Sequence, residues 1–332
     1  MTRNVRHVDL AETLALDPLP GDLARVEDGL RRAVTDPDRF LGDVAAHLMG
    51  AGGKRIRPTL TLCAAYAATG ADRPVPEPAL TGAVAVELVH LGSLYHDDVI
   101  DEAETRRGVP SVNARWSNIV AILAGDYLLA RASSLAASLG SEVAGLLAQT
   151  IGELCRGQVQ ELQHLFDVNR TKDDYTSAIE GKTAALFATA CRVGAMACDV
   201  AEPALGALVR FGHHLGMCFQ IVDDVLDLTG TDVALGKHAG QDLVEGVYTL
   251  PVIYALADCA SLRDLLGRPL DAERLAEARR LASTNGAVDA ALGLARDHAA
   301  KANEALCGAD GFDARASDGL HRLVTWLVTR SS

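Results

Sequence analysis

The chain has 332 residues and a formal net charge of −13, from 31 lysines and arginines against 44 aspartates and glutamates. Hydrophobic residues make up 49% of it and aromatic residues 4%, which excludes disorder as its main state and favours a core of Ala, Leu and Val packed between helices. An acidic chain is a poor general binder of nucleic acid, so no such partner is expected. Local basic residues, metal ions or both must hold any anionic substrate.

The N-terminal third predicts helices separated by polar loops. We expect residues 1–20 to be loosely ordered and residues 21–332 to form a single all-α domain. A proline-rich loop at Arg73–Pro78 precedes a long apolar helix over residues 79–96. Residues 101–118 are polar and rich in charge, and they predict a loop.

The rest of the chain also shows helical patterns. No proline occurs between Pro110 and Pro203, which predicts long helices with breaks near Gly140 and at residues 167–172. A long apolar helix, a glycine-containing loop and an amphipathic helical tail follow in that order, over residues 204–227, 230–246 and 270–332. No segment shows the apolar–polar alternation that is typical of strands.

Nothing in the sequence predicts a targeting or membrane-spanning segment. The first 16 residues carry acids and lack an apolar run, which argues against a secretory signal. Uncharged stretches reach about a dozen residues, whereas a membrane span needs about 20. The seven cysteines are scattered without a CxxC pattern, as expected for reduced thiols in a cytoplasmic protein.

Two segments place aspartates at positions i, i+1 and i+4: Asp97, Asp98 and Asp101, then Asp223, Asp224 and Asp227. On a helix, positions i and i+4 share one face, so the outer aspartates form a carboxylate pair. Like charges at this spacing repel each other unless a cation lies between them, and such oxygen ligands suit Mg²⁺. One motif alone fits a solvated acidic helix end equally well, but two copies on two apolar helices favour a metal site.

Basic residues lie near these motifs. Lys54, Arg55 and Arg57 follow two glycines just before a predicted helix, where backbone N–H groups and cations together form an anion site. Arg106 and Arg107 follow the first acidic motif. Any one of these cations would usually be a surface charge. Beside two metal motifs in an acidic chain, they indicate a diphosphate-binding site.

Taken together, these segments resemble the trans-isoprenyl diphosphate synthases, also called the polyprenyl synthetase family. The matching stretches are GGKRIRP, AVELVHLGSLYHDDVIDEAETRRG, GKTAALF, FQIVDDVLDLTG and GKHAGQDL, at residues 52–58, 85–108, 181–187, 219–230 and 236–243. They occur in the family's order and cover the chain from about residue 20 to its end. The resemblance implies an all-α bundle around a deep central cavity, a homodimer, and Mg²⁺-dependent condensation of isopentenyl diphosphate with an allylic diphosphate.

The resemblance also implies a role for each matching residue. About three Mg²⁺ ions are expected, held by Asp97, Asp101 and Asp223, with Asp98, Asp224 and Asp227 supporting them. The allylic diphosphate is expected to contact Arg106, Lys182 and Lys237. Isopentenyl diphosphate is expected to contact Lys54, Arg57, His90 and Arg107. Thr183 and Gln220 are expected to line the reacting carbons.

Some positions need separate treatment. The family's usual lysine before the TLP sequence is Val247 here, so substrate affinity or closure of the lid is expected to differ. From its apolar helix alone, His90 would be a core histidine, and only the family pattern makes it a substrate contact. His96, His213 and His214 are expected to be ordinary histidines.

Two other functions fit parts of the pattern. A class I terpene cyclase shares the fold and ionisation by Mg²⁺, but it normally lacks the second acidic motif and does not need the GGKRIRP segment. A non-catalytic subunit of a heteromeric synthase tends to lose the acidic motifs, and both are intact here. We therefore expect an active synthase.

Product length is expected to depend on the helix before Asp97. Gly92 and Ser93 lie one turn below that aspartate and are too small to form the aromatic floor of short-chain family members, and Val89 follows one turn lower. Each turn adds about 5.4 Å, close to one prenyl unit, which predicts a product of about thirty carbons or more, as in quinone side chains. The alternative is twenty-carbon geranylgeranyl diphosphate, if Tyr127 or Leu128 closes the path. A transient contact with a membrane surface is expected for product release.

Overall fold

The computed structural model describes residues 10–231, 239–284, 286–308 and 311–330. Its helices are α1 (Leu10–Leu14), α2 (Leu19–Val34), α3 (Arg39–Gly50), α4 (Ile56–Thr69), α5 (Glu77–Ile100), α6 (Val112–Arg115), α7 (Asn118–Ser138), α8 (Ser141–Gln163), α9 (Lys172–Ile179), the π-helix η1 (Glu180–Ala184), α10 (Ala185–Met196), α11 (Ala204–Thr229), α13 (Gln241–Glu245), α14 (Leu250–Asp258), α15 (Ala260–Leu265), α16 (Ala272–Ala282), α17 (Ala287–Cys307) and α18 (Ala314–Thr329). One antiparallel hairpin pairs β1 (Thr105–Arg106) with β2 (Val109–Pro110). The expected all-α fold class is confirmed.

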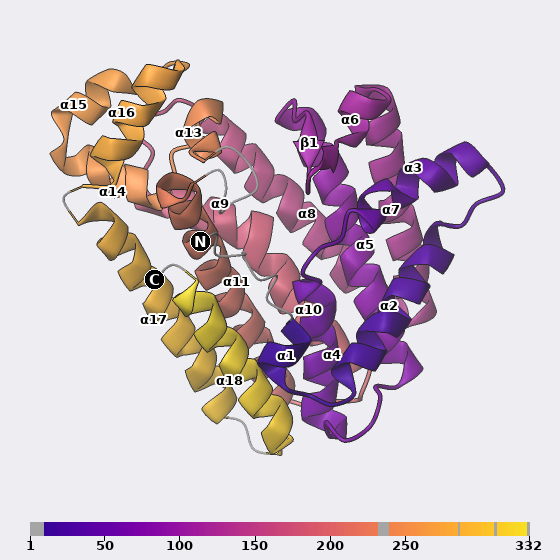
Figure 1. Cartoon of the computed structure of the whole chain (residues 1–332). Helices are drawn as coiled ribbons and strands as arrows, with labels where there is room; N and C mark the ends of the chain where they lie inside the picture. Colours follow the sequence, from indigo (N-terminus) through magenta and orange to yellow (C-terminus); the bar gives the residue numbers. More distant parts are fainter. Residues whose placement is uncertain (1–9, 232–238, 285, 309–310, 331–332) are drawn as a thin grey trace, which may run out of the picture.

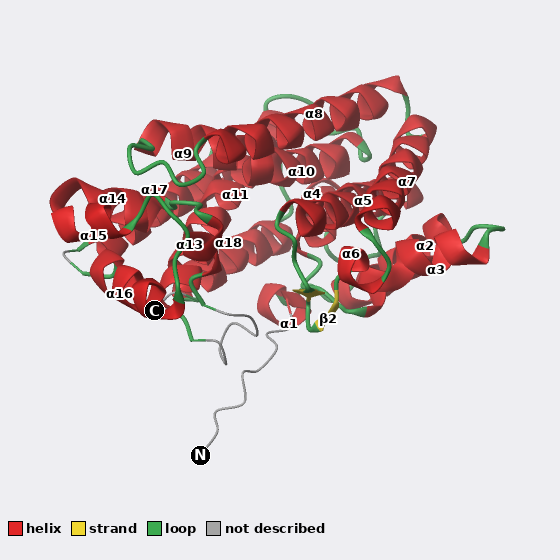
Figure 2. Cartoon of the chain, turned by 90° about the horizontal axis from the view of Figure 1, so that it is seen from above, coloured by secondary structure: helices red, strands yellow, loops and turns green. Residues whose placement is uncertain are grey.

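Long helices pass through the middle of the molecule and shorter ones cover its ends (Figure 1). Helix α10 contacts α4, α5, α8 and α11, so it lies at the centre of the bundle. Helices α2 and α3 lie on one flank (Figure 2), and α17 and α18 lie on the opposite side (Figure 1). Helices α13 to α16 form one end, around a separate small apolar cluster.

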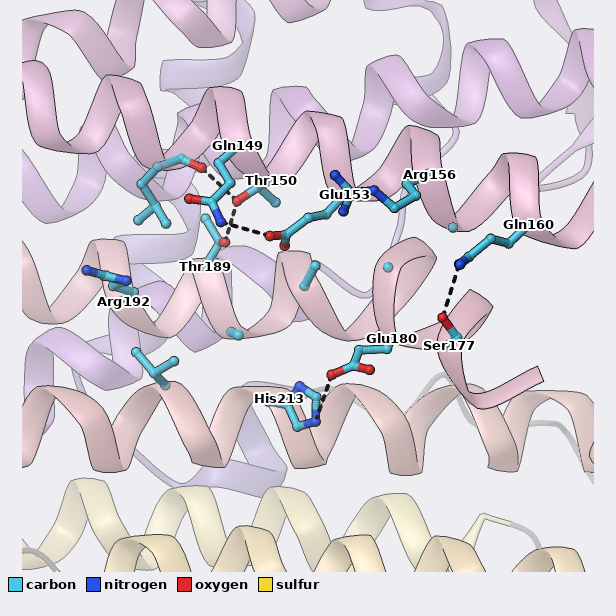
Figure 3. Close-up of a pocket in the computed structure, with 16 residues that line it drawn as sticks. Gln149, Thr150, Glu153, Arg156, Gln160, Ser177, Glu180, Thr189, Arg192 and His213 are labelled. Atoms are coloured by element: carbon cyan, nitrogen blue, oxygen red, sulfur yellow. Dashed lines mark hydrogen bonds and ion pairs between the residues drawn. The ribbon is translucent and has the colours of Figure 1, made fainter. Parts of the chain in front are cut away.

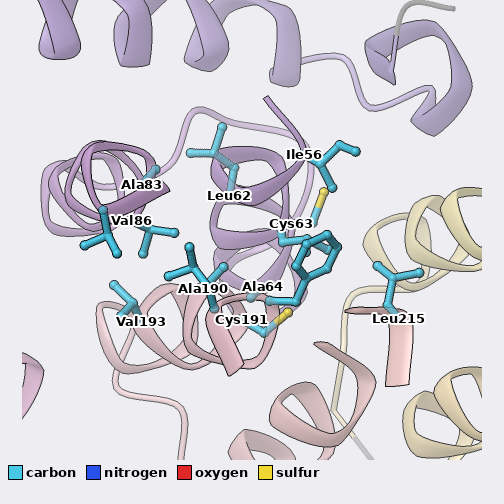
Figure 4. Packing of buried hydrophobic residues seen from close by; sticks show 14 of the residues in the cluster. Ile56, Leu62, Cys63, Ala64, Ala83, Val86, Ala190, Cys191, Val193 and Leu215 are labelled. Atoms are coloured by element: carbon cyan, nitrogen blue, oxygen red, sulfur yellow. The ribbon is translucent and has the colours of Figure 1, made fainter. Parts of the chain in front are cut away.

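The main core is built from small apolar side chains, which let helices approach closely. Leu62, Ala83, Val86 and Ala190 meet where α4, α5 and α10 pack together (Figure 4). At Gly194 of α10, an added Cβ would come within 2.1 Å of a backbone oxygen of α4. Any side chain there would therefore push two core helices apart, because protein interiors have few voids.

Local capping explains several helix boundaries. The Ser117 hydroxyl accepts from the backbone N–H of Val120 and begins α7. Thr171 and Asp174 form a reciprocal capping box that begins α9. Helix α8 begins directly after Gly140, so both predicted breaks in this stretch are confirmed.

The expectation of a loosely ordered N-terminus is wrong for residues 10–20. This segment forms α1 and the first residues of α2, and Leu14 and Leu19 are fully buried. Helix α1 packs against α18, from the other end of the chain, and Arg322 donates a hydrogen bond to the Leu14 carbonyl. The local sequence could not predict that this segment is ordered, because the helix that it packs against, α18, is distant in sequence. Residues 1–9 lie outside the described residues.

The hairpin interrupts a region that the sequence predicts as loop. Its arms are two residues each, too short to show an alternating pattern. Arg107 and Gly108 form its turn with φ angles of 54° and 77°. Positive φ at both central residues is what two-residue hairpin turns of the I′ type require. This turn decides where two neighbouring arginines point.

Within the described residues, one helix is long and apolar enough to cross a membrane by length and composition, namely α7, with a mean hydropathy of 1.4. One such helix is weak evidence, because core helices of globular proteins pass the same test. Helix α7 packs against α5 and α8. The expectation of no transmembrane segment therefore stays a prediction.

Candidate active site

Two cavities gather the residues that the sequence singles out. We call the larger one, of about 900 Å³, the acidic cavity; its lining includes Asp101, Arg106, Glu161, Lys182, Gln220, Asp224 and Val247. We call the other, of about 560 Å³, the basic cavity; its lining includes Lys54, Arg55, Arg57, Glu87, His90, Arg107 and Phe219. Arg106 and Arg107 are adjacent in sequence but line different cavities.

The first acidic motif ends α5. Burial and, less strongly, the nearby Asp101 raise the pKa of the half-buried Asp97, and although the Lys182 ammonium opposes both, the resulting pKa is about 6. Asp98 is fully buried and accepts a hydrogen bond from Arg106 Nε at 2.6 Å. Its other oxygen, Oδ2, is buried without a hydrogen-bond partner. This motif therefore has one aspartate held by the protein and two beside the cavity.

The second acidic motif lies in the last turns of α11. Asp223 is 39% exposed and pairs with Arg330 Nη2 at 3.3 Å. Asp224 is buried and accepts hydrogen bonds from the Tyr175 hydroxyl at 2.6 Å and from Gln220 Nε2 at 2.7 Å. Burial raises the pKa of Asp224 to about 7, because neutral donors compensate a buried charge only in part. Asp227 Oδ2 accepts from the backbone N–H of Asp242.

The donor set suits a hard divalent cation. The carboxylates of Asp97 and Asp101 repel each other, and the orphan oxygen of Asp98 lies behind them. Among the described residues, no group of three or more His, Cys, Asp or Glu is arranged to hold a metal ion by itself. A cation here would need further oxygen ligands from water or substrate, which is how Mg²⁺ is usually bound beside phosphates.

Lys182 and Thr183 lie on η1, where the helix carries a π-bulge. Lys182 Nζ donates to Glu161 Oε1 at 2.5 Å, and although burial lowers its pKa, the Glu161 and Asp97 carboxylates raise that pKa overall. The Thr183 hydroxyl donates to Gln220 Oε1 at 2.6 Å, and Gln220 in turn donates to Asp224. The predicted residues Thr183 and Gln220 are thus joined to the second acidic motif.

The basic cavity brings together all four residues predicted for it. Burial lowers the pKa of the half-buried Arg57 to about 10, and its guanidinium lies 5.0 Å from the Phe187 ring centroid. Burial and the surrounding arginines hold the pKa of His90 well below its usual value, so His90 is neutral at pH 7. Burial also lowers the pKa of Lys54, which lies 5.6 Å from the Trp326 ring centroid. These groups form a dense cationic surface around one neutral imidazole.

Sequence reasoning missed the residues that hold these groups in place. They are Glu161 on Lys182, Tyr175 on Asp224, Arg330 on Asp223 and Glu87 on Arg55. Glu87 had a sequence signal, because it is a lone charge within an apolar helix. Arg330 had none, since it reaches the site only through the packing of α18.

The three residues predicted to control product length do not share one environment. At Gly92, an added Cβ would come within 3.1 Å of the Gly125 oxygen and 3.2 Å of the Leu129 side chain, both on α7. Val89 is buried, and Ser93 is half-buried with its hydroxyl bonded to the His90 carbonyl. Tyr127 donates to Asp36 at 3.0 Å, so Leu129, rather than Tyr127 or Leu128, faces Gly92.

Other predicted or polar positions lie elsewhere. Lys237 falls outside the described residues. His96 contacts the Ile122 carbonyl of α7, and His214 contacts His298 of α17. A groove of about 400 Å³ between α8, α10 and α11 is lined by polar side chains that largely pair with one another, such as Thr150 with Thr189 (Figure 3). None of the residues predicted for the site lines this groove.

Comparison with known proteins agrees with this geometry. The model of the polyprenyl synthetase family matches residues 38–282. Nonaprenyl diphosphate synthase of Mycobacterium tuberculosis is 38% identical over 98% of this chain and 97% of its own. Heptaprenyl diphosphate synthase component 2 of Geobacillus stearothermophilus is 47% identical over 72% of this chain and 74% of its own.

A solved structure has the same architecture. The polyprenyl synthase of Caulobacter crescentus, complexed with calcium and isoprenyl diphosphate, superposes with a TM-score of 0.88 at 34% identity, covering 96% of this chain and 98% of the other. The likeness extends over nearly the whole length of both chains. The chain is therefore a member of the polyprenyl synthetase family and a prenyltransferase.

Proposed function

We propose that this prenyltransferase condenses isopentenyl diphosphate with an allylic diphosphate to make a long-chain all-trans polyprenyl diphosphate. The observation that carries the proposal is the presence of two separate cavities, each lined by basic side chains, with the two neighbouring arginines of one hairpin lining one cavity each. A cyclase acts on one diphosphate, whereas condensation needs two diphosphates side by side. Positioning two anionic reactants together is itself a large part of such catalysis.

The acidic cavity fits the allylic diphosphate. Asp97, Asp101 and Asp223 would hold Mg²⁺, which supplies charge stabilisation to the departing diphosphate when bound. Arg106 and Lys182 line the same cavity and would contact the diphosphate oxygens directly. Lys237 is proposed for the same role from its motif alone.

The basic cavity fits isopentenyl diphosphate, held by Lys54, Arg57, His90 and Arg107. The allylic C–O bond breaks and its electron pair leaves with the diphosphate. The alkene of isopentenyl diphosphate then forms the new C–C bond with the allylic carbocation, and a proton leaves the adjacent carbon. The released diphosphate is the proposed proton acceptor. Thr183 and Gln220, linked to Asp224, would orient groups beside the reacting carbons.

The product is proposed to be long-chain, about thirty carbons or more. The heptaprenyl and nonaprenyl synthases named above support this length. Small residues on α5 below Asp97 also support it, since no aromatic floor occurs there. A twenty-carbon product is the second candidate, because α7 packs directly against Gly92 and narrows this direction.

The assembly is proposed to be a homodimer, and the location cytoplasmic. Helix α7 exposes Ile119, Ile122 and Leu123, with exposed fractions of 72%, 44% and 60%, which fits an apolar face covered by a second copy. All seven cysteines lie in the described residues and are free thiols, as a reducing compartment would keep them. Because one relative is named as component 2 of a heptaprenyl diphosphate synthase, the alternative to a homodimer is an assembly with a different subunit.

The purified chain should be incubated alone with labelled isopentenyl diphosphate, an allylic primer and Mg²⁺, and the products separated by chromatography. We expect a ladder that ends at about thirty carbons or more, abolished by EDTA. A cyclised hydrocarbon formed without isopentenyl diphosphate would indicate a cyclase. Lack of any product from a folded chain would indicate a subunit that needs a different partner.

Product length can be tested in the same assay with Ser93→Phe. We expect a shorter product, because a phenyl ring would fill the turn below Asp97. Ala276→Phe, on the exposed face of α16, is the control and should leave the product unchanged. An unchanged product from Ser93→Phe would mean that another surface limits the chain.

A further inference from the structure

The basic cavity concentrates cations that repel one another. Lys54, Arg55, Arg57 and Arg107 all line it. The Coulombic effect of Arg107 lowers the pKa of Arg57, and that of Arg55 lowers the pKa of Arg107, in each case after burial itself. Without an anion among them, these side chains would turn away from each other and from the cavity. Such a site therefore needs a fixed counter-charge before the substrate arrives.

Glu87 supplies that charge from the middle of α5. Its side chain is 2% exposed and accepts a hydrogen bond from Arg55 Nη1 at 2.9 Å. Arg55 is also held by Glu27 of α2, whose Oε1 lies 2.5 Å from Arg55 Nε. The guanidinium of Arg55 is thus paired with carboxylates from two helices, so it serves the structure of the protein rather than substrate binding.

The same carboxylate acts on the two arginines that remain for the substrate. After burial, Glu87 has the largest effect on the pKa of both Arg57 and Arg107, and it raises both. Arg107 lies across the glycine turn and donates to the Gly52 carbonyl. An added Cβ on Gly53 would come within 2.7 Å of Arg107 Nη1, so the glycine leaves room for the guanidinium.

We propose that Glu87 is the positioning residue of the basic cavity: it fixes Arg55 as a structural anchor and holds Arg57 and Arg107 toward the diphosphate of isopentenyl diphosphate. The inference rests on the proposed function of this cavity. Glu87 lines the basic cavity and does not line the acidic cavity, so we expect its effect to fall on one substrate.

Glu87→Gln is the sharpest variant, because it keeps the size of the side chain and an acceptor for Arg55 but removes the charge. We expect the KM for isopentenyl diphosphate to rise by roughly tenfold, while the KM for the allylic substrate changes less than about twofold. The Kd of isopentenyl diphosphate, measured by intrinsic fluorescence with Trp326 beside Lys54, should rise to the same extent.

Asp22→Asn is the matched control. Asp22 is also a buried carboxylate paired with an arginine, Arg25, but it lines neither cavity. Its neutralisation should lower the melting temperature without changing either KM. This control separates a general loss of stability from a loss of positioning.

Four results would contradict the inference or the proposed function. An active wild type whose Glu87→Gln variant has an unchanged or lower KM for isopentenyl diphosphate would overturn the inference, as would an equal rise in both KM values. A wild type that binds isopentenyl diphosphate but makes no product contradicts the proposed function instead. If Glu87→Gln does not fold, Glu87→Asp keeps the charge but withdraws it, and an unchanged KM in that variant would also overturn the inference.

Discussion

The two acidic motifs share the same spacing but are held in different ways. In each, the middle aspartate is buried and bonded to protein, but Asp101 lines the acidic cavity from the first motif and Asp224 lines it from the second. Asp98 is held by a cation, Arg106, whereas Asp224 is held by the neutral donors Tyr175 and Gln220. An identical sequence pattern thus hides two electrostatic environments.

This difference teaches what the middle residue does. A cation beside a buried carboxylate stabilises its charged form, while hydroxyl and amide donors do so more weakly. Burial raises the pKa of Asp224 to about 7, so its charge depends on pH and on nearby cations. Burial raises the pKa of Asp98 too, but there the Arg106 guanidinium opposes the shift, whereas Asp224 has only neutral donors to do so.

Removing an outer aspartate should have the largest effect. We expect Asp97→Ala and Asp223→Ala each to lower kcat by about a thousandfold or more, because each removes a proposed metal ligand. Asp98→Asn and Asp224→Asn should cost less, about tenfold to a hundredfold. Steady-state kinetics at saturating Mg²⁺ measures this, with the exposed Asp318→Ala as control. Near-normal turnover of Asp97→Ala would contradict the metal assignment.

Removing the partner of each middle aspartate should affect stability unequally. Arg106→Gln leaves the buried Asp98 without its cation, which should cost about 3 kcal/mol. Tyr175→Phe removes a neutral donor from Asp224, which can take up a proton instead, and should cost about 1 kcal/mol. Urea unfolding at pH 7 in EDTA compares the two. Equal losses would mean that the two environments do not differ in this way.

The second motif should make stability depend on pH. Since the pKa of Asp224 is about 7 in the folded protein against 3.8 for an ordinary aspartate, the folded state binds more protons between these values. Its contribution is complete below about pH 4 and is lost as the pH rises through about 7. Asp97, with a pKa of about 6, acts in the same direction.

Urea unfolding in EDTA at several pH values should therefore show a free energy of unfolding that falls across this window. Asp224→Asn should flatten the fall, since the amide does not titrate. A free energy that rises over the same range, or an unchanged slope in Asp224→Asn, would contradict the assigned environment.

The smallest expected effect concerns Val247, which lines the acidic cavity beside the second motif. Val247→Lys should lower the KM for the allylic substrate by about twofold to fivefold, because the new ammonium can reach the diphosphate. Val244→Lys is the matched control, since Val244 is 39% exposed and does not line the cavity. Equal KM values for the two variants would make this lid position irrelevant to binding.

The sequence predicted the residues of the candidate site better than it predicted the residues that hold them in place. Local spacing was enough to predict the helix breaks, both acidic motifs and the two groups of cations. On a helix, residues four positions apart lie on the same face, so their spacing in the sequence gives their arrangement directly. The family resemblance implied the division of Arg106 from Arg107, but local spacing alone could not predict it, because it depends on positive φ in the turn of a six-residue hairpin. Glu161 and Arg330 also escaped prediction, since their partners lie on other helices.

The π-helix at Glu180–Ala184 also shapes how this family segment can vary. A π-turn holds one residue more than an α-turn, so it accommodates one extra residue without ending the helix. The helical phase before it and after it differs by about 100°, the step of one residue at 3.6 per turn. Deleting Gly181 would remove the extra residue and restore regular α-helical geometry. Lys182 and Thr183 would then be rotated relative to the part of the helix that precedes them. A deletion or insertion in this segment should therefore be tolerated only when a second, compensating change keeps the rotation between the two parts of the helix.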